Sequence, residues 1–334
     1  MKSKKLIKEL INNSFYGIAI GDALGVPVEF CSRGALENYP VVNMIGNGTY
    51  NQPKGTFSDD TSLTFATAMG LCNRKNIRHH IANEFVKWYK DGEYAINNKV
   101  FDVGNTTAKA IGNFILTNSV SRMCEPIYHQ NGNGSLMRIM PVAFYLYNNS
   151  EYDTIEKRKI FISDISALTH KHIISKICCV IYVEIALEII KQQINNNFSI
   201  DNLLDTIKIV IEKVYHTYTL NSIIEMYISE LNNIFHYDIF DYSRDKVNSS
   251  GYVINTLESV LWCITHTHSF IDAMLTAVNL GGDTDTIGSL TGGLAGLIYS
   301  FDTIPNGWID DLQGRDIIDT VVKRFSKYII KHNL

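Results

Sequence analysis

The segment from residue 281 to residue 299 restricts the possible folds of this chain more than any other. It begins Gly-Gly-Asp-Thr-Asp-Thr and continues as an apolar run in which Gly288, Gly292 and Gly296 recur every four residues. Residues four apart share one face of an α-helix, so the glycines form a bare stripe on which another helix can pack closely. We therefore expect a buried helix in this segment, with a pair of acids just before it.

The two acids of that segment, Asp283 and Asp285, have a counterpart far upstream. Residues 58–60 read Ser-Asp-Asp and precede the run 63–71, which has the Ala, Leu and Met content of a helix. Acids at a helix start are often only caps, since they accept hydrogen bonds from free N–H groups and meet the positive end of the helix dipole. Neither cluster contains the Lys or Arg that a structural ion pair would need, and each has a hydroxyl beside it. These features favour a metal site over two unrelated caps.

Together the two clusters offer an all-oxygen set of donors. Carboxylate and hydroxyl oxygens suit Mg²⁺, Mn²⁺ or Ca²⁺ rather than zinc or copper. Four acids exceed what one Mg²⁺ usually takes from a protein, so we expect two ions that share bridging carboxylates. The residues alone therefore point to Asp59, Asp60, Asp283 and Asp285 as candidate metal ligands, with a Ser or Thr hydroxyl beside each pair.

Helical spacing of apolar residues recurs along the chain, whereas no part alternates polar and apolar residues over the length of a strand. With 334 residues and 46% hydrophobic content, the chain can bury a large core. We therefore predict an all-α fold, a single compact helical domain over residues 1–334 with a di-metal cleft. Helices are expected at 4–20 (continuing through small residues to Gly25), 61–73, 77–90, 108–116, 158–192 and 287–299.

Two segments stand apart from these helices. Residues 31–57 are rich in Gly and Pro and are predicted as a loop, which is long for a compact domain and so favours a functional role. Residues 193–248 are Asn-rich with amphipathic stretches, and we interpret them as a lid or surface lobe of the domain. Residues 278–280 are either a short strand or the end of a helix.

Charge and cysteine content exclude several classes of protein. The formal net charge is −4 and no basic stripe is present, so we expect no nucleic-acid partner. No segment reaches about 18 uninterrupted apolar residues, so we expect no membrane span. The six cysteines show no C-x-x-C spacing, which is typical of reduced thiols in a cytoplasmic protein.

Two further features precede helices. Residues 130–134 form a glycine-rich turn ahead of a helix, where exposed N–H groups can bind an anion such as phosphate, although a merely flexible turn is the commoner explanation. His170 lies at the start of the long apolar face in 158–192, beside these turns. Glu29 follows Pro27, which disfavours continuation of the first helix, so Glu29 is expected in a loop.

Six motifs occur in a characteristic order. They are G-D-A-L-G-x-P-x-E-F from Gly21, S-D-D-T from Ser58, F-D-x-G-N-T-T from Phe101, G-N-G-S-L-M-R from Gly132, T-H at Thr169 and G-G-D-T-D-T from Gly281. In this combination the chain resembles the ADP-ribosylglycohydrolase family, which includes the hydrolase that reactivates dinitrogenase reductase and the ADP-ribosyl-arginine hydrolases. Each motif alone is modest evidence, but six in order, covering most of the chain, are specific.

The resemblance implies an all-α fold with two Mg²⁺ (or Mn²⁺) at the base of a cleft. The metal ligands that it implies are Ser58, Asp59, Asp60, Asp283, Asp285 and Thr286. Ser58 stands where the family more commonly has Thr, and Thr284 where it more commonly has Ala. The other implied site residues are Asp102, Gly104 and Asn105 at the ribose and reacting centre, Gly132 and Asn133 around the diphosphate, His170 and Tyr252 lining the ADP-ribose pocket, and Glu29 near the reacting centre.

The implied activity is a metal-dependent removal of ADP-ribose from an ADP-ribosylated protein, with free ADP-ribose as product. The motif spacing favours the N-glycosidic bond of ADP-ribosyl-arginine, with Asp102 as first choice for the acid/base and Glu29 as second. Ser-linked ADP-ribose or O-acetyl-ADP-ribose is an alternative substrate. A non-catalytic ADP-ribose-binding or toxin-neutralising protein is another alternative, as is a di-metal phosphohydrolase, in which His170 and Tyr252 would be ordinary core residues.

Overall fold

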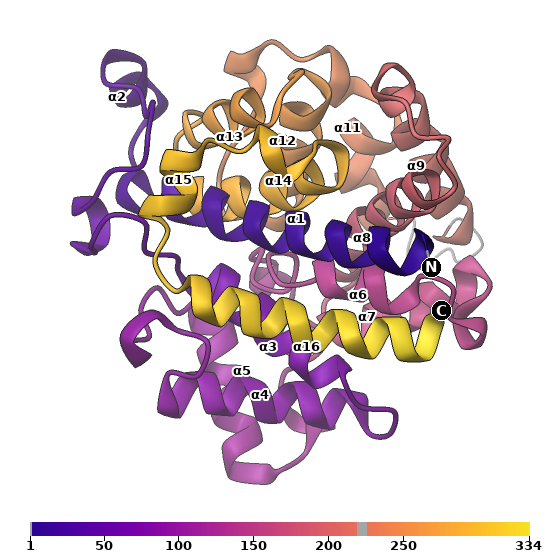
Figure 1. The fold of residues 1–334 in the computed structure, drawn as a ribbon. Helices are drawn as coiled ribbons and strands as arrows, with labels where there is room; N and C mark the ends of the chain where they lie inside the picture. The colour runs from indigo at the N-terminus through magenta and orange to yellow at the C-terminus, as the bar shows by residue number, and fades with distance from the viewer. Residues whose placement is uncertain (1, 219–225) are drawn as a thin grey trace.

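Helices account for the regular structure of residues 2–218 and 226–334, which are the residues that the computed structural model describes (Figure 1). Apart from helices, these residues form only two isolated antiparallel bridges, Asn47 with Gln52 and Gly132 with Tyr252. The predicted all-α class is therefore confirmed. The α-helices are α1 (Lys2–Gly25), α2 (Arg33–Asn38), α3 (Asp59–Leu71), α4 (Ile77–Asp91), α5 (Asn105–Thr117), α6 (Met140–Leu146), α7 (Ile155–Ser166), α8 (Ile173–Ile194), α9 (Leu203–Tyr218), α11 (Asn232–Phe235), α12 (Val253–Thr265), α13 (Phe270–Val278), α14 (Thr284–Ile298), α15 (Asn306–Asp311) and α16 (Arg315–Asn333).

The first helix, α1, and the glycine-striped helix α14 form the most extensive helix pair in the fold. Their backbones touch along the predicted stripe: a Cβ atom built on Gly292 would lie 2.0 Å from the carbonyl oxygen of Gly17, and one on Gly288 would lie 2.4 Å from that of Gly21. Only glycine at these positions lets two helices approach so closely. The pairing confirms the expectation that a second helix packs on the stripe.

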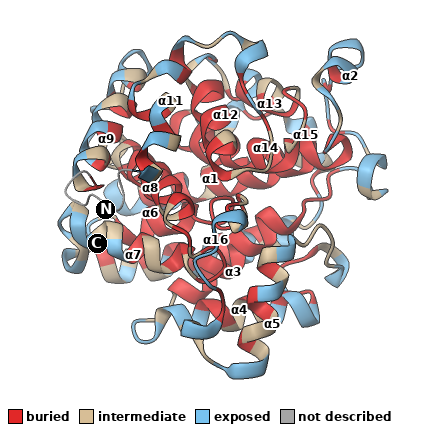
Figure 2. Ribbon diagram, turned by 180° about the vertical axis from the view of Figure 1, so that it is seen from behind, coloured by how far each residue is buried: buried red, intermediate tan, exposed pale blue. Residues whose placement is uncertain are grey.

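Around this pair the remaining helices enclose a continuous core. Helices α12 and α13 pack on α14, α16 packs on α1 and α3, and α8 packs on α6 and α12 (Figure 1). Figure 2 shows the buried residues concentrated in α1, α3, α8, α12 and α14, with exposed residues at the periphery. The start of α14 and the start of α3 are both buried, so two acid-bearing helix ends lie inside the protein.

Two local expectations differ from the structure. The single helix predicted over 158–192 is two helices, α7 and α8, because the intervening residues turn and the His172 side chain caps α8 by accepting a hydrogen bond from the Ile174 N–H. The predicted loop 31–57 contains the short helix α2, which Ser32 caps by accepting from the Ala35 N–H at 3.3 Å. For residues 278–280, the helix-end alternative is confirmed, because α13 ends at Val278 and Asn279 is its C-cap.

The remaining helix predictions at 61–73, 77–90, 108–116 and 287–299 are confirmed to within a few residues at each end. The lid or lobe interpretation of 193–248 stays a prediction, and residues 219–225 of that segment lie outside the described residues. Among the helices that the structure describes, none combines the length and apolar character needed to cross a membrane.

Candidate active site

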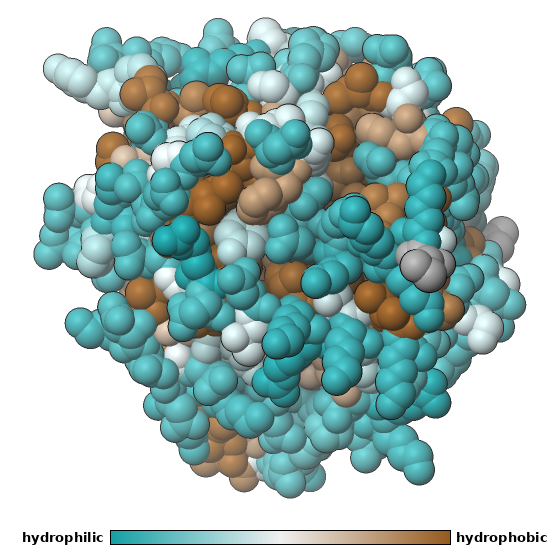
Figure 3. Space-filling view, viewed as in Figure 1, coloured by the Kyte–Doolittle hydropathy of each residue, from teal (hydrophilic) through white to brown (hydrophobic). Residues whose placement is uncertain are grey.

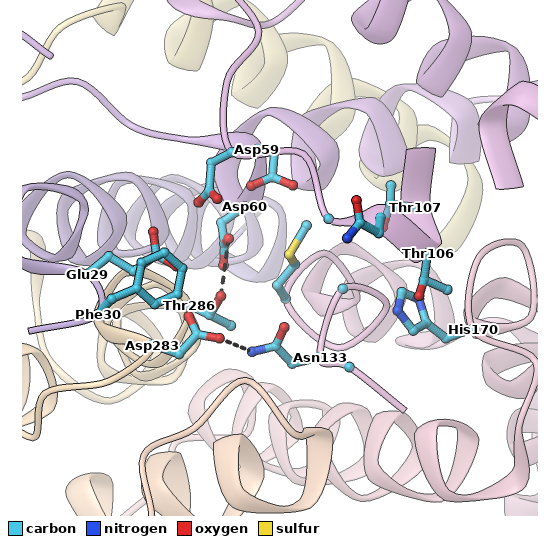
Figure 4. A pocket seen from close by; sticks show the side chains of 16 residues that line it. Glu29, Phe30, Asp59, Asp60, Thr106, Thr107, Asn133, His170, Asp283 and Thr286 are labelled. Carbon is cyan, nitrogen blue, oxygen red and sulfur yellow. Dashed lines mark hydrogen bonds between the residues drawn. The ribbon is translucent and has the colours of Figure 1, made fainter. Parts of the chain in front are cut away.

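A cavity of about 270 Å³ lies where the starts of α3, α5 and α14 meet three further segments of the chain (Figure 4). Its walls come from six stretches that are far apart in the sequence, so only the completed fold assembles it. The lining residues are Glu29, Phe30, Asp59, Asp60, Asp102, Gly104, Asn105, Thr106, Thr107, Gly132, Asn133, Gly134, Met137, His170, Asp283 and Thr286.

The two acidic clusters meet at this cavity. Ser58 is the N-cap of α3, and its Oγ accepts a hydrogen bond from the Asp60 N–H at 3.3 Å. At the start of α14, the Thr286 hydroxyl donates to Asp60 Oδ2 at 3.3 Å, which joins one cluster to the other (Figure 4). Capping accounts for Ser58 but not for Asp283, which is the N-cap of α14 and accepts no capping hydrogen bond. Capping also does not explain why two such helix starts face each other in the interior.

The chain reversal before α14 depends on two glycines. Gly281 and Gly282 have φ values of +75° and +74°, a conformation that costs a residue with a Cβ atom. A Cβ atom on Gly282 would also lie 2.3 Å from the carbonyl oxygen of Ser249. These glycines therefore let the backbone turn tightly and direct the acids that follow toward the cavity.

The acids have oxygen atoms that the protein itself leaves without partners. Glu29, Asp283 and Asp285 each offer a carboxylate oxygen, and the three atoms lie within 4.8 Å of one another. Buried oxygens on Glu29, Asp60 and Asp285 accept no hydrogen bond among the described residues. A buried polar atom without a partner is costly, and a carboxylate more so, which indicates that a bound group completes the site. Because all donors are oxygens, the residues fit a hard divalent cation.

The electrostatics of the cluster lead to the same requirement. Burial, followed by the neighbouring Asp102 charge, raises the pKa of Glu29 to about 9. Burial raises the pKa of Asp59, Asp60 and Asp285 well above the usual range, and nearby carboxylates raise it further. Burial and mutual repulsion therefore disfavour ionisation of these carboxyl groups together, whereas bound divalent cations would favour it.

Asp22, on α1, is a buried acid of this region to which the sequence analysis gave no role. Its Oδ1 accepts from the Ser58 N–H at 2.9 Å, and its Oδ2 accepts from the Thr61 N–H at 3.0 Å and the Thr61 hydroxyl at 2.6 Å. Asp22 thus fixes the start of α3, on which Ser58 and two acids sit. The sequence feature that could have indicated this role is that Asp22 is the only acid among the small residues at the end of the first helix.

Asp102 and Glu29 occupy the same wall of the cavity. The Tyr50 hydroxyl donates a hydrogen bond to Asp102 Oδ1. The pKa of Tyr50 is raised by burial and by hydrogen bonding to Asp102 and Glu29. Asp102 has a φ of +56°, a left-handed conformation that Asp tolerates better than most residues. Tyr50 was missed by the sequence analysis because it belongs to the long loop 31–57, which carries no motif.

The opposite wall is built from the glycine-rich turn and His170. Arg138 Nη2 donates to Thr169 Oγ1 at 2.8 Å, and Thr169 Oγ1 lies 2.9 Å from His170 Nδ1. Because Arg only donates, the Thr169 hydroxyl hydrogen can point at Nδ1, which leaves the proton of the imidazole on Nε2. A Cβ atom on Gly132 would lie 3.8 Å from that Nε2. Burial and the Arg138 charge lower the pKa of His170 to about 3, so a neutral ring faces the turn.

The turn is tied to the metal-candidate acids. Asn133 Nδ2 donates to Asp283 Oδ2 at 2.7 Å and to Thr256 Oγ1 at 2.9 Å (Figure 4). The Asn133 N–H donates to the carbonyl of Gly251. The loop predicted to surround a diphosphate is therefore held against the acidic cluster by side-chain and backbone bonds.

Three of the predicted site residues do not line the cavity. Ser58 and Asp285 are buried behind its wall, beside the acids that do line it. Tyr252 pairs with Gly132 in an isolated bridge, and its hydroxyl donates to Glu230 at 2.9 Å. The other predicted residues all contribute to the lining, with Thr106, Thr107, Gly134, Met137 and Phe30 as additions that the sequence analysis did not assign.

Comparison with known proteins places these residues in a family context. The model of the family described as ADP-ribosylglycohydrolase matches residues 3–333. An ADP-ribosylarginine hydrolase of Serratia proteamaculans is 29% identical over 310 residues, which are 92% of this chain and 76% of that protein. An ADP-ribosyl-[dinitrogen reductase] glycohydrolase of Rhodospirillum rubrum is 26% identical over 305 residues, covering 90% of this chain and 88% of that protein.

Among solved structures, an ADP-ribosylglycohydrolase-related protein complex has a similar fold. Its TM-score is 0.76, with 23% sequence identity, and the match covers 99% of this chain and 100% of that chain. The likeness extends over the whole helical arrangement and supports the fold.

Proposed function

The chain belongs to the ADP-ribosylglycohydrolase family, and on that premise we propose that it is a metal-dependent hydrolase that releases ADP-ribose from arginine residues of modified proteins. One observation carries the proposal: buried carboxylate oxygens without hydrogen-bond partners lie at a cavity that a glycine-rich turn and a neutral histidine also line. Such a cavity can hold a cation at one end and an anionic ligand at the other. The arginine linkage is supported by the names of the relatives from Serratia and Rhodospirillum.

The proposed cofactor is a pair of Mg²⁺ or Mn²⁺ ions. The residues that would hold them are Ser58, Asp59, Asp60, Asp283, Asp285 and Thr286, with Glu29 as a further carboxylate within reach. Bound divalent cations would supply Lewis acidity and offset the charge of the clustered acids.

In the proposed complex, the turn and His170 bind the diphosphate. Gly132 and Asn133 border the cavity, and His170 would donate from Nε2 to a phosphate oxygen. Gly104 and Asn105, at the start of α5, line the same cavity and are proposed to bind the ribose. Tyr252, which does not line this cavity, is proposed to contact the ligand beyond the turn to which it is bridged.

Hydrolysis breaks the bond between the anomeric carbon and the guanidine nitrogen and forms one to a water oxygen. The transition state resembles an oxocarbenium ion, so one carboxyl group would protonate the departing nitrogen while a carboxylate takes a proton from water. We assign the acid/base role to Asp102, which lines the cavity and is held by Tyr50. Glu29 stays second, because it belongs to the group of carboxylates that could hold a cation, and a carboxylate engaged by a cation is not free to carry the proton.

The test is hydrolysis of an arginine-ADP-ribosylated protein with Mg²⁺, with Mn²⁺ and with a chelator, followed by the release of free ADP-ribose. We expect release with either metal and none with the chelator. Parallel reactions with Ser-linked ADP-ribose and O-acetyl-ADP-ribose decide the linkage. Tight ADP-ribose binding without release from any of these would identify a binding protein, and neither release nor binding would refute the proposal.

The role of Asp102 is tested separately with Asp102→Asn. The amide cannot take up or deliver the proton, so we expect kcat to fall by at least about 100-fold, the usual contribution of a general acid or base. Metal binding, measured by calorimetry, should persist. Full turnover with metal bound would refute the assignment.

A further inference from the structure

Large apolar side chains are exposed on the segment that leaves the cavity and passes through α2. Tyr39 is 85% exposed, Val42 71% and Phe30 69%, and Ile45 is also exposed. We call these four side chains the apolar arm. Figures 1 and 2 show α2 and the loop around it projecting from the edge of the molecule, and Figure 3 shows hydrophobic surface at the same edge. Exposed apolar groups gathered on one projection indicate a contact surface.

The arm is firmly anchored, so loose packing does not account for its exposure. Leu36, Val41 and Met44 in the same segment are buried. The side chain of Asn279 accepts from the Val41 N–H and donates to the Val41 carbonyl, both at 2.8 Å. Arg33 donates from Nε to the carbonyl of Leu280 at 2.9 Å. The buried apolar residues therefore anchor the segment, whereas the side chains of the apolar arm remain exposed to solvent.

Phe30 connects the arm to the cavity. It lines the cavity beside Glu29 and Asp283 and is exposed at the same time (Figure 4). Its φ is +63°, which is costly for a bulky residue, and its N–H donates to the Gly282 carbonyl at 2.7 Å. Strain of this kind is kept where the position of a side chain matters. Phe30 thus places an exposed aromatic ring at the mouth of the candidate active site, on the same segment of the chain as the other side chains of the arm.

The composition of the arm indicates what binds it. Residues 38–53 contain no charged side chain, although 19% of the chain is charged. The nearest acid before them, Glu37, pairs with Arg244 at 3.0 Å. A small anionic ligand such as ADP-ribose gains little from this surface. A neutral, apolar patch on a folded protein matches it.

We propose that the apolar arm docks the protein that carries the ADP-ribosyl group, through an apolar patch next to the modified side chain. This inference rests on the proposed function and adds to it a recognition surface outside the cavity. The arm would select among modified proteins, whereas the cavity would treat the ADP-ribosyl-arginine group alike in all of them.

The experiment compares two substrates, an arginine-ADP-ribosylated protein and ADP-ribosyl-arginine as a free amino acid. The variant is Tyr39→Ser with Val42→Ser, and the matched control is Ile160→Ser, which removes a side chain that is 63% exposed on α7. We expect the double variant to lose about tenfold in kcat/KM on the protein substrate, because two apolar side chains no longer leave water on binding. Its kcat/KM on the free amino acid, and both values for the control, should stay unchanged.

Each other outcome overturns the inference in an identifiable way. An equal kcat/KM of variant and wild type on the protein substrate shows that the arm does not dock it. An equal fall on both substrates shows that the arm supports the cavity instead. A wild-type dimer that the double variant converts to monomer, by light scattering, without loss of activity on the protein shows that a second copy covers the arm. If the wild type hydrolyses neither substrate, the proposed function fails and the inference falls with it.

Discussion

Replacing Gly292 by Ala should separate the two helices that carry the site, although the residue itself touches no acid of the cavity. The added Cβ would lie 2.0 Å from the carbonyl oxygen of Gly17, whereas ordinary contacts begin at 3.4 Å. One backbone must therefore shift by about 1.4 Å, and no side-chain rotation can relieve a clash with a carbonyl group. Overpacking typically costs about 1–3 kcal/mol, and a backbone clash belongs at the upper end of that range. Alanine's higher helix propensity offsets about 1 kcal/mol.

The matched control is Gly112→Ala, in the interior of α5, where a Cβ atom would meet nothing within 4 Å. There only the propensity gain applies, so we expect a stabilisation of up to about 1 kcal/mol. Urea denaturation followed by circular dichroism measures both free energies of unfolding. We expect Gly292→Ala to be less stable than the control by about 3 kcal/mol.

Calorimetry with Mg²⁺ gives the second readout, because Asp22 and Asp285 lie on the two displaced helices. Gly292→Ala should weaken metal binding and Gly112→Ala should not. If the two variants differ by less than about 1 kcal/mol in unfolding and bind Mg²⁺ alike, the close approach of α1 and α14 does not set the geometry of the site.

Three further predictions concern the buried polar groups. Asp22→Asn should cost about 1–3 kcal/mol in the free energy of unfolding and weaken Mg²⁺ binding, because an amide nitrogen cannot accept the bonds from Ser58 and Thr61; unchanged denaturation and calorimetry would contradict this. Thr169→Val removes the hydrogen-bond partner of His170 Nδ1, so ¹⁵N NMR should show mixed imidazole tautomers where the wild type shows one. An unchanged spectrum would show that Thr169 does not set the tautomer of His170. Burial raises the pKa of Asp22 to about 7, so the stability of the metal-free protein should fall as pH rises from about 4 through 7, and the increase in Tm on adding Mg²⁺ should be larger at pH 8 than at pH 5. Equal increases at both pH values would show that the acids do not exchange protons for the cation.

The fold and site could be predicted from the sequence where residues with metal-binding chemistry stand next to a helical repeat. Acids without basic neighbours, placed before helical runs at 58–60 and 283–286, indicated which helix starts would face each other. The glycine stripe predicted the tight helix pair because residues four apart lie on the same face of a helix, so the glycines leave that face without side chains. The absence of strand alternation predicted the all-α class.

Features that depend on tertiary contacts were not predictable in this way. The break between α7 and α8 contains neither Gly nor Pro, and it is fixed by a histidine cap that apolar spacing cannot reveal. Asp22 could not be paired with Ser58 because their meeting requires α1 and α3 to pack side by side. Tyr50 likewise gains its role from contact with Asp102, 52 residues away.

The close pairing of α1 with α14 also has a consequence for how the protein is made. Thr284, at the start of α14, donates to the Gly25 carbonyl at the end of α1, and 259 residues separate the two. At a synthesis rate of about 5–20 residues per second, α1 leaves the ribosome about 13–50 s before its principal partner exists. During that interval its apolar and glycine-lined face is uncovered, so we expect the nascent chain to depend on chaperones until the last fifth of the polypeptide has emerged.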